Sequence, residues 1–390
     1  MRPTVFLQPK KQGNIRRGHP WIFPKAILRE KGKLITGELV DIFSAENEPI
    51  GVGVYNEHSL YRIRVLALAF EGINTDSIVD IVKHRFKQAL EVRRRIDLPN
   101  QDTTAFRVVN SEADGLSGIT IDRFNNTYVV SSTAYWVQAH QNELMICIKE
   151  VFQAENILWL AQAKPLAQDG WQDTNSQELS GSEIVLEAGV KYAVDFSNTQ
   201  KTGLFLDQRE NHQRIAALAK GKHVLDLYTY TGGFALHAAK GGALSVTAVD
   251  SSEQAIRLAE QNARLNELDS IQFIAADARD YLSQAENYDL VILDPPKLVP
   301  SQRHIERAKN YYRFLHREVF KSLKSGSLLL TCNCSSALPT LEFNELVSAQ
   351  AMTIGKMVRI LGVYGPASCH PTLAAFPEGN YLTATLLAVV

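Results

Sequence analysis

The sequence predicts an α/β protein that carries a parallel, doubly wound sheet, preceded by a small β-barrel and an α+β segment. From residue 222 onward, apolar runs of strand length alternate with helix-like runs, as in sheets made of successive β-α units. Residues 1–72 instead show short apolar runs broken by Gly and Pro, a pattern typical of a small barrel. A chain of 390 residues is long for one core. We therefore expect domains over residues 1–72, 73–190 and 191–390.

The first segment combines predicted strands with a basic and aromatic stretch. LITGELVDIFS, PIGVGVYN and LYRIRVLAL are the predicted strands. RRGHPWIFPKAI precedes them and supplies cations and an aromatic ring that suit a phosphate backbone and a stacked base, namely Arg16, Arg17, His19, Trp21 and Lys25. Trp21 and Phe23 fit a barrel core equally well, and for these two residues we favour the core.

The middle segment is predicted to mix helices and strands. Apolar residues at helical spacing predict a helix over 76–96, where Arg93, Arg94 and Arg95 complement the helix dipole. Two or three strands are expected within 106–133, a helix at about 136–153, and strands near 157–160 and 183–187. The polar stretch 162–182 predicts a loop. In the last segment, two late strands near 357–363 and 381–388 complete the parallel sheet.

The most informative motif is VILDPPK, at 291–297. Its apolar run predicts a buried strand, and the two prolines must end it, because proline lacks an N–H and fixes φ. Asp294 then lies at the carboxyl edge of the sheet, where open α/β sheets bind ligands. Asp-Pro-Pro at such an edge suggests a methyltransferase that acts on a planar, nitrogen-bearing substrate such as a nucleobase.

Three more strand ends predict a cofactor site. The first strand ends with Asp226 and leads through a loop to Gly232 and Gly233, which allow a ligand to approach the backbone closely. The second ends in Asp250, 18 residues after Gly232, where an acid can accept the hydroxyls of a ribose, and the third ends in Asp277, placed for an adenine edge. NAD fits less well than S-adenosylmethionine, because TYTGGF lacks the G-x-G-x-x-G spacing that holds a pyrophosphate.

Two cysteines reach the same predicted edge on the fifth strand, SLLLTCNCSS. Cysteine is the strongest nucleophile available at neutral pH, and a thiolate that attacks C6 of a pyrimidine makes C5 able to accept a methyl group. A neighbouring acid such as Asp294 would assist by protonating N3. Buried cysteines are more often small apolar residues. The strand pattern does not choose between Cys332 and Cys334, since both side chains point the same way.

The composition limits where the protein is expected to be located and what it is expected to bind. No apolar stretch reaches membrane-spanning length, and MRPTVFLQPKK lacks the apolar core of a secretory signal, so we expect a cytoplasmic protein without membrane contact. No cysteines form a C-x-x-C pair, and no metal site is predicted. Residues 1–100 hold 17 Lys and Arg against 11 Asp and Glu, and this positive excess fits a nucleic-acid partner. On charge alone we favour ordinary variation in composition as its explanation, because domains that bind nucleic acid are often much more basic.

Several motifs together resemble the RlmI-type 23S ribosomal RNA cytosine-5 methyltransferases over nearly the whole chain. GHPWIFPKAI is similar to the opening of that family's PUA domain, QKTGLFLDQR (200–209) to its hairpin signature, and LYTYTGGFALHAAKGGA to its cofactor loop. ILDPPK resembles its fourth motif and CHPTLAAFPEGNYL (369–382) its carboxy-terminal signature. The resemblance implies a PUA domain, an EEHEE middle domain and a Rossmann-like class I methyltransferase domain with a leading β-hairpin.

The resemblance also implies roles for single residues. The family's sixth motif, Ser-Cys-Ser-Gly, aligns with residues 333–336 and selects Cys334 as the nucleophile, with Asn333 and Ser336 as departures that put the exact RNA target in doubt. Lys297 would hold the RNA backbone or orient Asp294, or else be solvent-exposed. The implied S-adenosylmethionine contacts are Gln208, Arg209, Asp226, Tyr228, Thr231, Gly232, Gly233, Asp250, Asp277 and Asp294. Arg209 suits the cofactor's carboxylate but could equally be a surface cation before a helix.

The implied partner is ribosomal RNA, and a homodimer is left open as the assembly. Two other readings stay open beside cytosine C5 methylation. An exocyclic-amine methyltransferase would carry an aromatic residue after Asp-Pro-Pro to stack on the extruded base, where this chain has Lys297. A non-catalytic RNA-binding protein with a vestigial site would not need the acids and Cys334.

Overall fold

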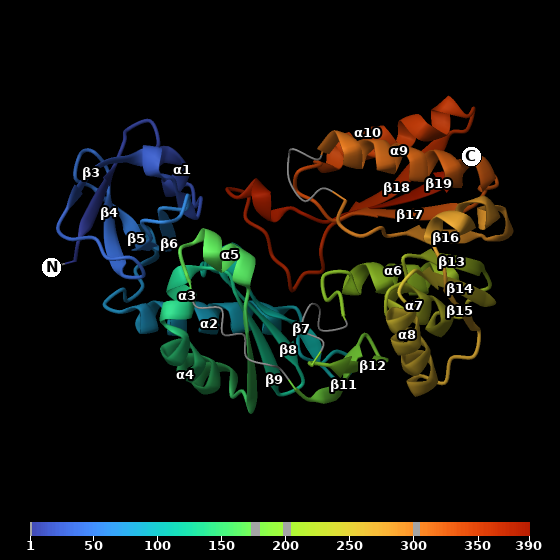
Figure 1. The fold of residues 1–390 in the computed structure, drawn as a ribbon, viewed down its shortest axis with the longest axis horizontal. Helices are drawn as coiled ribbons and strands as arrows, with labels where there is room; N and C mark the ends of the chain where they lie inside the picture. Colours follow the sequence, from blue (N-terminus) through green and yellow to red (C-terminus); the bar gives the residue numbers. More distant parts are fainter. Residues whose placement is uncertain (1, 173–179, 198–203, 299–304) are drawn as a thin grey trace. The chain divides into compact units, whose positions relative to one another are not determined.

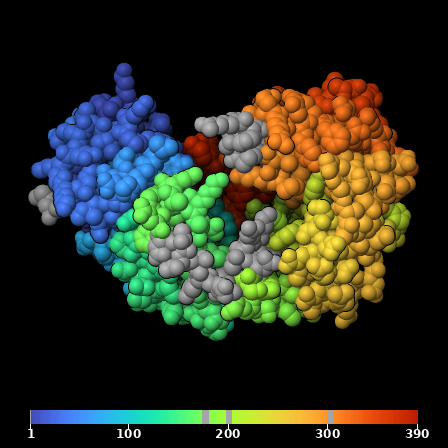
Figure 2. Space-filling model, viewed as in Figure 1, coloured from blue at the N-terminus to red at the C-terminus, as the bar shows by residue number. Residues whose placement is uncertain are grey.

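The computed structural model describes residues 2–172, 180–197, 204–298 and 305–390. Tertiary contacts divide the chain into two compact units. The first comprises Met1–Gly181, Phe196–Thr199 and Cys369–Gly379, and the second Ser182–Asp195, Gln200–Ser368 and Asn380–Val390. Figure 2 draws the surface of the first mostly in blue to green and that of the second mostly in yellow to red. The predicted division at 190/191 therefore falls inside a hairpin of the second unit.

The first unit begins with a six-stranded sheet that encloses a small apolar core. Its order is β2-β6-β5-β4-β1-β3, and a short helix α1 (Gln12–Arg16) follows β1. Alternate strand residues such as Val5, Val40 and Ile63 fill the core, as expected for strands buried on one face. The strands are β1 (Thr4–Leu7), β2 (Trp21–Ile22), β3 (Ile27–Lys31), β4 (Leu39–Phe43), β5 (Pro49–Tyr55) and β6 (Ile63–Leu68).

The first unit continues with helices packed on a second sheet of order β10-β9-β8-β7. Ser77 caps the long helix α2 (Ile78–Arg95) by accepting a hydrogen bond from Asp80 N at 3.1 Å. The strands are β7 (Ala105–Asn110), β8 (Ile119–Phe124), β9 (Thr127–Ser132) and β10 (Asn156–Ala161), and the further helices are α3 (Tyr135–Ala139), α4 (Gln141–Phe152) and α5 (Ala163–Gln168). Helix α5 corrects the first part of the predicted loop over 162–182, because its residues bury Leu166, while residues 173–179 of that loop lie outside the described residues.

Arg93 also differs from the prediction that it merely complements the dipole of α2. Its side chain is fully buried and donates to both carboxylate oxygens of Asp114 at 2.7 and 2.8 Å and to Cys369 O at 2.8 Å. A buried guanidinium needs such partners, because an unpaired charge in a core is strongly destabilising. Arg93 therefore ties α2 to a turn, η3 (Ser111–Asp114), and to the Cys369–Gly379 segment of the same unit.

The second unit opens with a hairpin and is built on a seven-stranded sheet of order β15-β14-β13-β16-β17-β19-β18. Its strands are β11 (Ser182–Glu187) and β12 (Val190–Asp195) in the hairpin, then β13 (His223–Leu227), β14 (Ser245–Asp250), β15 (Ile271–Ala275), β16 (Leu290–Leu293), β17 (Leu328–Asn333), β18 (Val358–Tyr364) and β19 (Thr383–Val389). Its helical elements are α6 (Arg209–Ala219), α7 (Gly233–Lys240), α8 (Glu253–Leu265), the 3₁₀ segment η4 (Ala278–Asn287), α9 (Ile305–Ser322) and α10 (Thr340–Thr353).

The large sheet has a core on each face. Leu225 and Leu293 point to the face covered by α9 and α10, while Val224 and Ile292 point to the face covered by α6 and α7 (Figure 1). This alternation explains the near-continuous apolar sequence of the central strands, which are buried on both sides.

One strand departs from the all-parallel prediction. β19 runs antiparallel to both β17 and β18, whereas β13, β14, β15, β16 and β17 pair in parallel. No α-helix lies between β18 and β19, and a strand that returns without a crossover helix must run in the opposite direction. Within the described ranges, no helix is long and apolar enough to cross a membrane.

Candidate active site

The ends of four neighbouring parallel strands carry the chemical groups of the site. Asp226 lies in β13, Asp250 ends β14, Asp294 directly follows β16, and Cys334 directly follows β17. The register pairs Leu227 with Leu293 and Leu293 with Thr331, so the strands end at nearly the same level. The structure thus gathers these predicted residues at one sheet edge, where α/β sheets bind ligands.

The loop after β13 has a backbone that few side chains tolerate. Tyr228, Tyr230 and Gly232 have φ values of 67°, 53° and 89°, all in the left-handed region. Gly233 begins α7, and a Cβ there would lie 2.6 Å from His212 Nε2. Backbone strain of this kind clusters at ligand-binding sites, and the missing side chain of Gly233 lets the loop pack closely against His212.

Two acids hold this loop. Asp250 accepts hydrogen bonds from Tyr230 N and Ser252 N, each at 2.9 Å. Asp226 is fully buried and accepts from Thr229 Oγ1 at 2.5 Å and from Ala235 N at 3.0 Å. Burial raises the pKa of Asp226 to about 6. Asp226 is therefore placed to position the cofactor loop rather than to present its carboxylate to solvent.

Thr231 and Tyr228 complete the loop. Thr231 is buried, and its carbonyl accepts from Asn262 Nδ2 of α8 at 3.2 Å. The Tyr228 hydroxyl lies 3.3 Å from the hydroxyl of Tyr311 in α9, a contact that the sequence did not predict. Tyr228 thus connects the loop to the opposite helical layer.

Asp277 lies farther along the edge, at the start of η4. Its carboxylate accepts from Arg279 N at 2.9 Å and forms an ion pair with the Arg279 side chain, which lowers the pKa of Asp277. The carboxylate predicted to meet an adenine edge is therefore already engaged by Arg279.

Gln208 and Arg209 occupy the start of α6, and both are buried. Gln208 Nε2 donates to Asp294 Oδ2 at 3.0 Å, while Gln208 Oε1 accepts from Asn211 Nδ2 at 2.6 Å. Arg209 is 6% exposed, so it is not the surface cation that the sequence left open. Its Nε has no hydrogen-bond partner within the described residues, and a buried guanidinium with a spare donor fits the carboxylate of a ligand.

Asp294 has a strongly altered acidity. Burial, followed by the negative charges of Asp207 and Asp226, raises the pKa of Asp294 to about 7. Asp207 was not assigned a role from the sequence, although it belongs to the quoted QKTGLFLDQR stretch. Its Oδ2 accepts from the hydroxyl of Tyr381 at 2.7 Å. At neutral pH the Asp294 carboxyl is therefore poised to give or accept a proton.

The two cysteines differ in accessibility. Cys332 is completely buried within β17, and burial followed by the charge of Asp294 raises its pKa well above the usual value. Cys334 is only partly buried. Burial, then the charges of Asp294 and Asp207, raise the pKa of Cys334 to about 12, and the cation of Lys297 opposes this rise. Lys297 itself is exposed, as the third sequence alternative expected.

Asn333 fixes the turn that presents Cys334. It is 1% exposed and donates to the carbonyls of Ser335 at 3.2 Å and Leu338 at 2.9 Å, while its Oδ1 accepts from the Tyr312 hydroxyl at 3.2 Å. The sequence marked Asn333 only as a departure from a family motif. Two of these hydrogen bonds are local, and only the contact with Tyr312, 21 residues away, depends on the tertiary packing.

The basic amino-terminal stretch forms a separate surface in the first unit. Arg16 is exposed and donates to Glu48 at 2.6 Å, and the ring of Trp21 stacks on Tyr61 with centroids 4.0 Å apart. Phe23 is 42% exposed, so its predicted place in the barrel core is wrong. The short turn η1 (Pro24–Ala26) directs Ala26 inward in its place.

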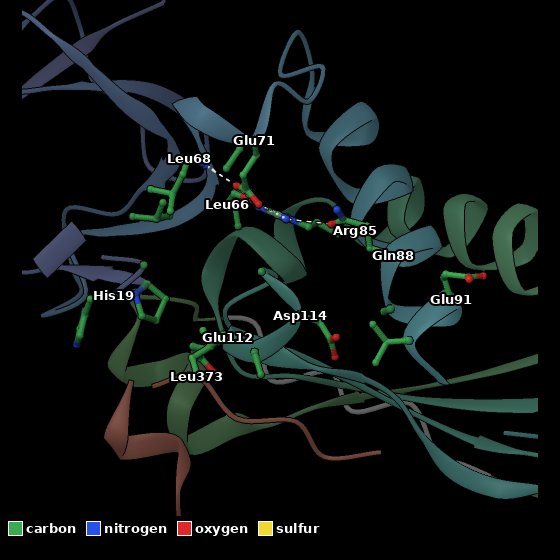
Figure 3. Close-up of a pocket in the computed structure, with 18 of the residues that line it drawn as sticks. His19, Leu66, Leu68, Glu71, Arg85, Gln88, Glu91, Glu112, Asp114 and Leu373 are labelled. Carbon is green, nitrogen blue, oxygen red and sulfur yellow. Dashed lines mark hydrogen bonds and ion pairs between the residues drawn. The ribbon is translucent and has the colours of Figure 1, made fainter. Parts of the chain in front are cut away.

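A cavity of about 460 Å³ also lies in the first unit (Figure 3). Arg85 spans it and forms an ion pair with Glu71 at 2.7 Å, and Asp114 in its lining is neutralised by Arg93. Arg85 also donates a hydrogen bond to the Leu66 carbonyl of β6. The charged residues of the lining therefore have a structural role, because they join α2 to this strand.

Comparisons with known proteins agree with this architecture. Residues 153–360, more than half of the chain, match the model of an S-adenosylmethionine-dependent methyltransferase family, and residues 5–68 match that of a PUA-like domain. The ribosomal RNA large subunit methyltransferase I of Alteromonas mediterranea is 33% identical over 100% of this chain and 99% of its own length. That of Vibrio parahaemolyticus serotype O3:K6 is 32% identical over 98% of both chains.

Solved structures share the fold at lower identity. A proposed S-adenosylmethionine-dependent methyltransferase from Streptococcus mutans superposes with a TM-score of 0.79 at 20% identity, covering 99% of both chains. A proposed methyltransferase solved as a complex with SAH superposes with a TM-score of 0.82 at 20% identity and the same coverage. The predicted fold class, the family resemblance and S-adenosylmethionine as the cofactor are thereby confirmed.

Proposed function

The chain belongs to the ribosomal RNA large subunit methyltransferase I family, and from this premise we propose that it methylates carbon 5 of a cytosine in 23S ribosomal RNA. The observation that carries the proposal is the pairing of Asp294 and Cys334 at the ends of neighbouring strands. The negative charge of Asp294 contributes to the raised pKa of Cys334, so the two groups are electrostatically coupled.

S-adenosylmethionine, when bound, supplies an electrophilic methyl group. The residues of the second unit fit it. The left-handed backbone of Tyr228, Tyr230 and Gly232 is of the kind that clusters at ligand-binding sites, and Arg209 offers a buried donor to a carboxylate. Asp250, at the end of β14, is the acid that would accept the ribose hydroxyls while it holds Tyr230 N.

Cys334 is the nucleophile in this mechanism, and it requires activation. A thiol whose pKa is about 12 is almost entirely protonated at neutral pH. Asp294, with a pKa of about 7, is partly ionised there and can accept the thiol proton. The sulfur then bonds to C6 of the cytosine, and the protonated Asp294 passes its proton to N3.

The remaining steps return the enzyme to its starting state. C5, now an enamine-type carbon, bonds to the methyl group as the bond between that group and the sulfonium sulfur breaks. A base then removes the C5 proton, and the C6–sulfur bond breaks to restore the C5–C6 double bond and the Cys334 thiolate. N3 returns its proton to Asp294, which passes it to the Cys334 thiolate and so restores the thiol and the ionised carboxylate. Gln208 would hold Asp294 in place throughout, through its 3.0 Å hydrogen bond.

The first unit supplies the RNA-binding surface in this proposal. We propose a PUA-like domain at 1–72, an EEHEE-like domain from 73 to about 181, and a methyltransferase domain that begins with the hairpin Ser182–Asp195 in place of the predicted boundary at 190/191. Exposed Arg16 and Arg17, with the exposed ring of Phe23, suit phosphate and base contacts.

The cysteines offer a matched pair for the decisive experiment. Cys334→Ala should abolish methyl transfer while S-adenosylmethionine binding persists, and Cys332→Ala should keep most activity. With target RNA that carries 5-fluorocytosine, the wild-type enzyme and Cys332→Ala should form a covalent adduct that denaturing gels detect, because fluorine cannot leave C5 as a proton does.

Other outcomes point elsewhere. A fully active Cys334→Ala enzyme, or an adduct that persists in it, would overturn the assignment of the nucleophile. Methyl transfer by the wild-type enzyme without any adduct, and with the methyl group found on an exocyclic nitrogen, would favour the amine-directed reaction instead. Lys297, exposed at the position that would need a stacking ring, counts against that alternative.

A further inference from the structure

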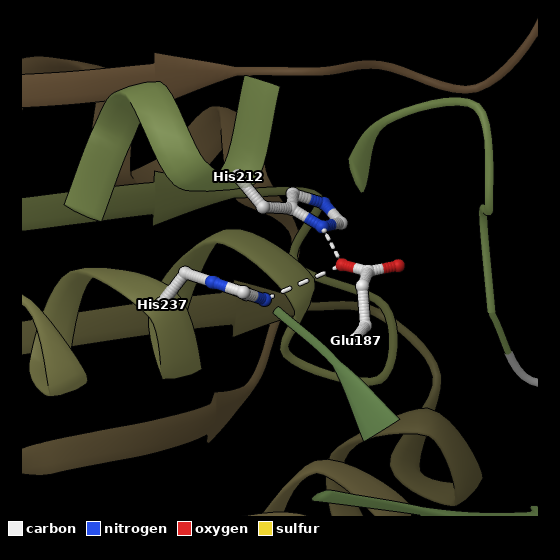
Figure 4. Close-up of side chains that lie close together, drawn as sticks. All are labelled: Glu187, His212 and His237. Carbon is white, nitrogen blue, oxygen red and sulfur yellow. Dashed lines mark hydrogen bonds and ion pairs between the residues drawn. The ribbon is translucent and has the colours of Figure 1, made fainter. Parts of the chain in front are cut away.

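We propose that Glu187, His212 and His237 form a binding site for a divalent transition-metal ion of the zinc class. The three residues come from separate elements, the end of β11, the first half of α6 and the middle of α7 (Figure 4). All are buried, at 0%, 5% and 2% exposure. This proposal is independent of the methyl-transfer reaction proposed above.

The geometry places one ligand atom of each residue around a common point. Glu187 Oε1 forms a hydrogen bond of 2.6 Å with His212 Nδ1 and lies 3.3 Å from His237 Nε2, and the ligand atoms of the three residues all lie within 4.8 Å of one another. The two imidazole rings are stacked, with centroids 5.3 Å apart, and both direct a nitrogen toward the carboxylate (Figure 4). Two imidazoles and a carboxylate are a frequent ligand set for zinc and related ions.

Polar atoms without partners support a ligand at this point. Glu187 Oε2 and the hydroxyl of Tyr192 are buried without a hydrogen-bond partner in the described part of the chain, and the contact of His237 Nε2 with Glu187 Oε1 at 3.3 Å is an ion pair without good hydrogen-bond geometry. The ring of Tyr192 stacks on His237 with centroids 6.5 Å apart, so this hydroxyl belongs to the same buried region. A native core rarely leaves several polar atoms unpaired in one place, and a bound ion would satisfy them.

The position of the site indicates a stabilising role rather than a catalytic one. The ion would join the hairpin β11–β12 to α6 and α7, which flank the cofactor loop. His212 lies directly against Gly233, the first residue after that loop, while Gln208 and Arg209 begin the same helix as His212. Metal occupancy should therefore raise the thermal stability of the second unit and tighten S-adenosylmethionine binding.

Cobalt(II) is the probe that tests the site, because its visible absorption reports coordination number and ligand type. The full chain, expressed without a histidine tag and freed of metal by a chelator, should bind one equivalent of Co²⁺. It should then show the d–d bands of nitrogen and oxygen coordination, lose them when Zn²⁺ is added, and melt at a higher temperature. X-ray absorption of the zinc form should show nitrogen and oxygen scatterers at about 2.0–2.2 Å and no sulfur.

Glu187→Gln and His237→Asn should abolish these bands, whereas His223→Asn, which alters an exposed histidine of the same unit, should retain them. Circular dichroism verifies that each variant is folded. The wild-type spectra alone decide the matter if both site variants fail to fold. Failure of the wild-type chain to bind Co²⁺ or Zn²⁺, thiolate-to-cobalt charge-transfer bands, or a folded His237→Asn that binds as tightly as wild type would overturn the proposal.

Discussion

Asp294 shows how burial prepares a single carboxyl group for proton transfer. Its pKa of about 7 results first from desolvation and then from the nearby negative charges of Asp207 and Asp226. Gln208 limits the rise by donating a hydrogen bond. Asp207 also raises the pKa of Cys334, as does Asp294 itself, so the proposed acid and nucleophile are electrostatically coupled, as in other sites with altered acidity.

The raised pKa of Asp294 predicts a specific pH dependence of stability. Its native pKa lies above the ordinary value of 3.8, so the folded state binds the proton more tightly than the unfolded state. The resulting stabilisation is complete below about pH 3.8 and is lost as pH rises through about 7. Asp294→Asn carries no ionisable group at this position. Relative to this variant, wild type should therefore become less stable between about pH 4 and 7.

Urea denaturation of both proteins across this range measures the effect. The exposed Asp269→Asn provides the matched control, and its stability relative to wild type should change little across the same range. A constant difference between wild type and Asp294→Asn would mean that the Asp294 carboxyl is not perturbed by folding.

Asp250→Ala should weaken S-adenosylmethionine binding. The change removes the acceptor of Tyr230 N and Ser252 N as well as the proposed partner of the ribose, so we expect a loss of at least ~1–3 kcal/mol in binding free energy. Isothermal titration calorimetry measures the affinity. Glu253→Ala, three residues away in an exposed position on α8, should bind as wild type does. Unchanged affinity in Asp250→Ala would remove Asp250 from the cofactor site.

At the scale of elements, the site depends on how each strand ends. β16 stops at a pair of prolines, and β17 stops where Asn333 turns its amide back to the carbonyls of Ser335 and Leu338. The end of β16 is determined by the local sequence, whereas the end of β17 is fixed by side-chain hydrogen bonds. Tyr312 of α9 adds a tertiary contact to the second, so the helix covering the sheet also supports the presentation of Cys334.

Asn333→Ala should therefore slow methyl transfer and destabilise the second unit. It leaves two buried carbonyl groups and the Tyr312 hydroxyl without their partner, which costs roughly 1–3 kcal/mol in the free energy of unfolding. We expect kcat to fall more than S-adenosylmethionine affinity, because the cofactor loop follows another strand. Asn310→Ala, on the exposed side of α9, is the control and should change neither quantity. An Asn333→Ala enzyme of wild-type kcat and stability would contradict this role.

At the scale of the whole molecule, the chain consists of two units that carry different kinds of functional residues. The first joins a PUA-like sheet to an α+β region and holds the basic amino-terminal stretch, while the second holds most of the segment that matches the methyltransferase family and the proposed reacting groups. Buried ion pairs such as Arg93 with Asp114 join the parts of the first unit. The second unit relies on apolar layers on the two faces of its sheet.

RNA capture by the first unit should depend on salt. Replacing Arg16 and Arg17 together by Gln should weaken RNA binding and lower the slope of log K against log salt by on the order of 1 to 2, as expected when one or two phosphate contacts are lost. S-adenosylmethionine affinity should stay unchanged. Arg257→Gln, an exposed cation of the second unit, serves as the control in filter-binding titrations. An unaltered slope in the double variant would exclude this stretch as the docking surface.

The sequence alone determined the fold class, the positions of the main strands and the cofactor, because these follow from local patterns. Asp-Pro-Pro must end a strand wherever it occurs, and acids that follow parallel strands must share an edge. The antiparallel orientation of β19 could not be predicted from the pattern of the strand itself. It depends on the connection between β18 and β19, which contains no crossover helix.

Only the tertiary structure decided which of the site residues are buried and what they touch. Asp226 and Asp250 look alike in sequence, yet one is enclosed by its own loop and the other is only partly buried. Arg209 is a core residue, and Phe23 is a surface residue, against expectation. Glu187, His212 and His237 are separated by up to 50 residues and meet only because a hairpin and two helices pack together. Burial and long-range contacts depend on the packing of the whole unit, and local sequence patterns do not predict that packing.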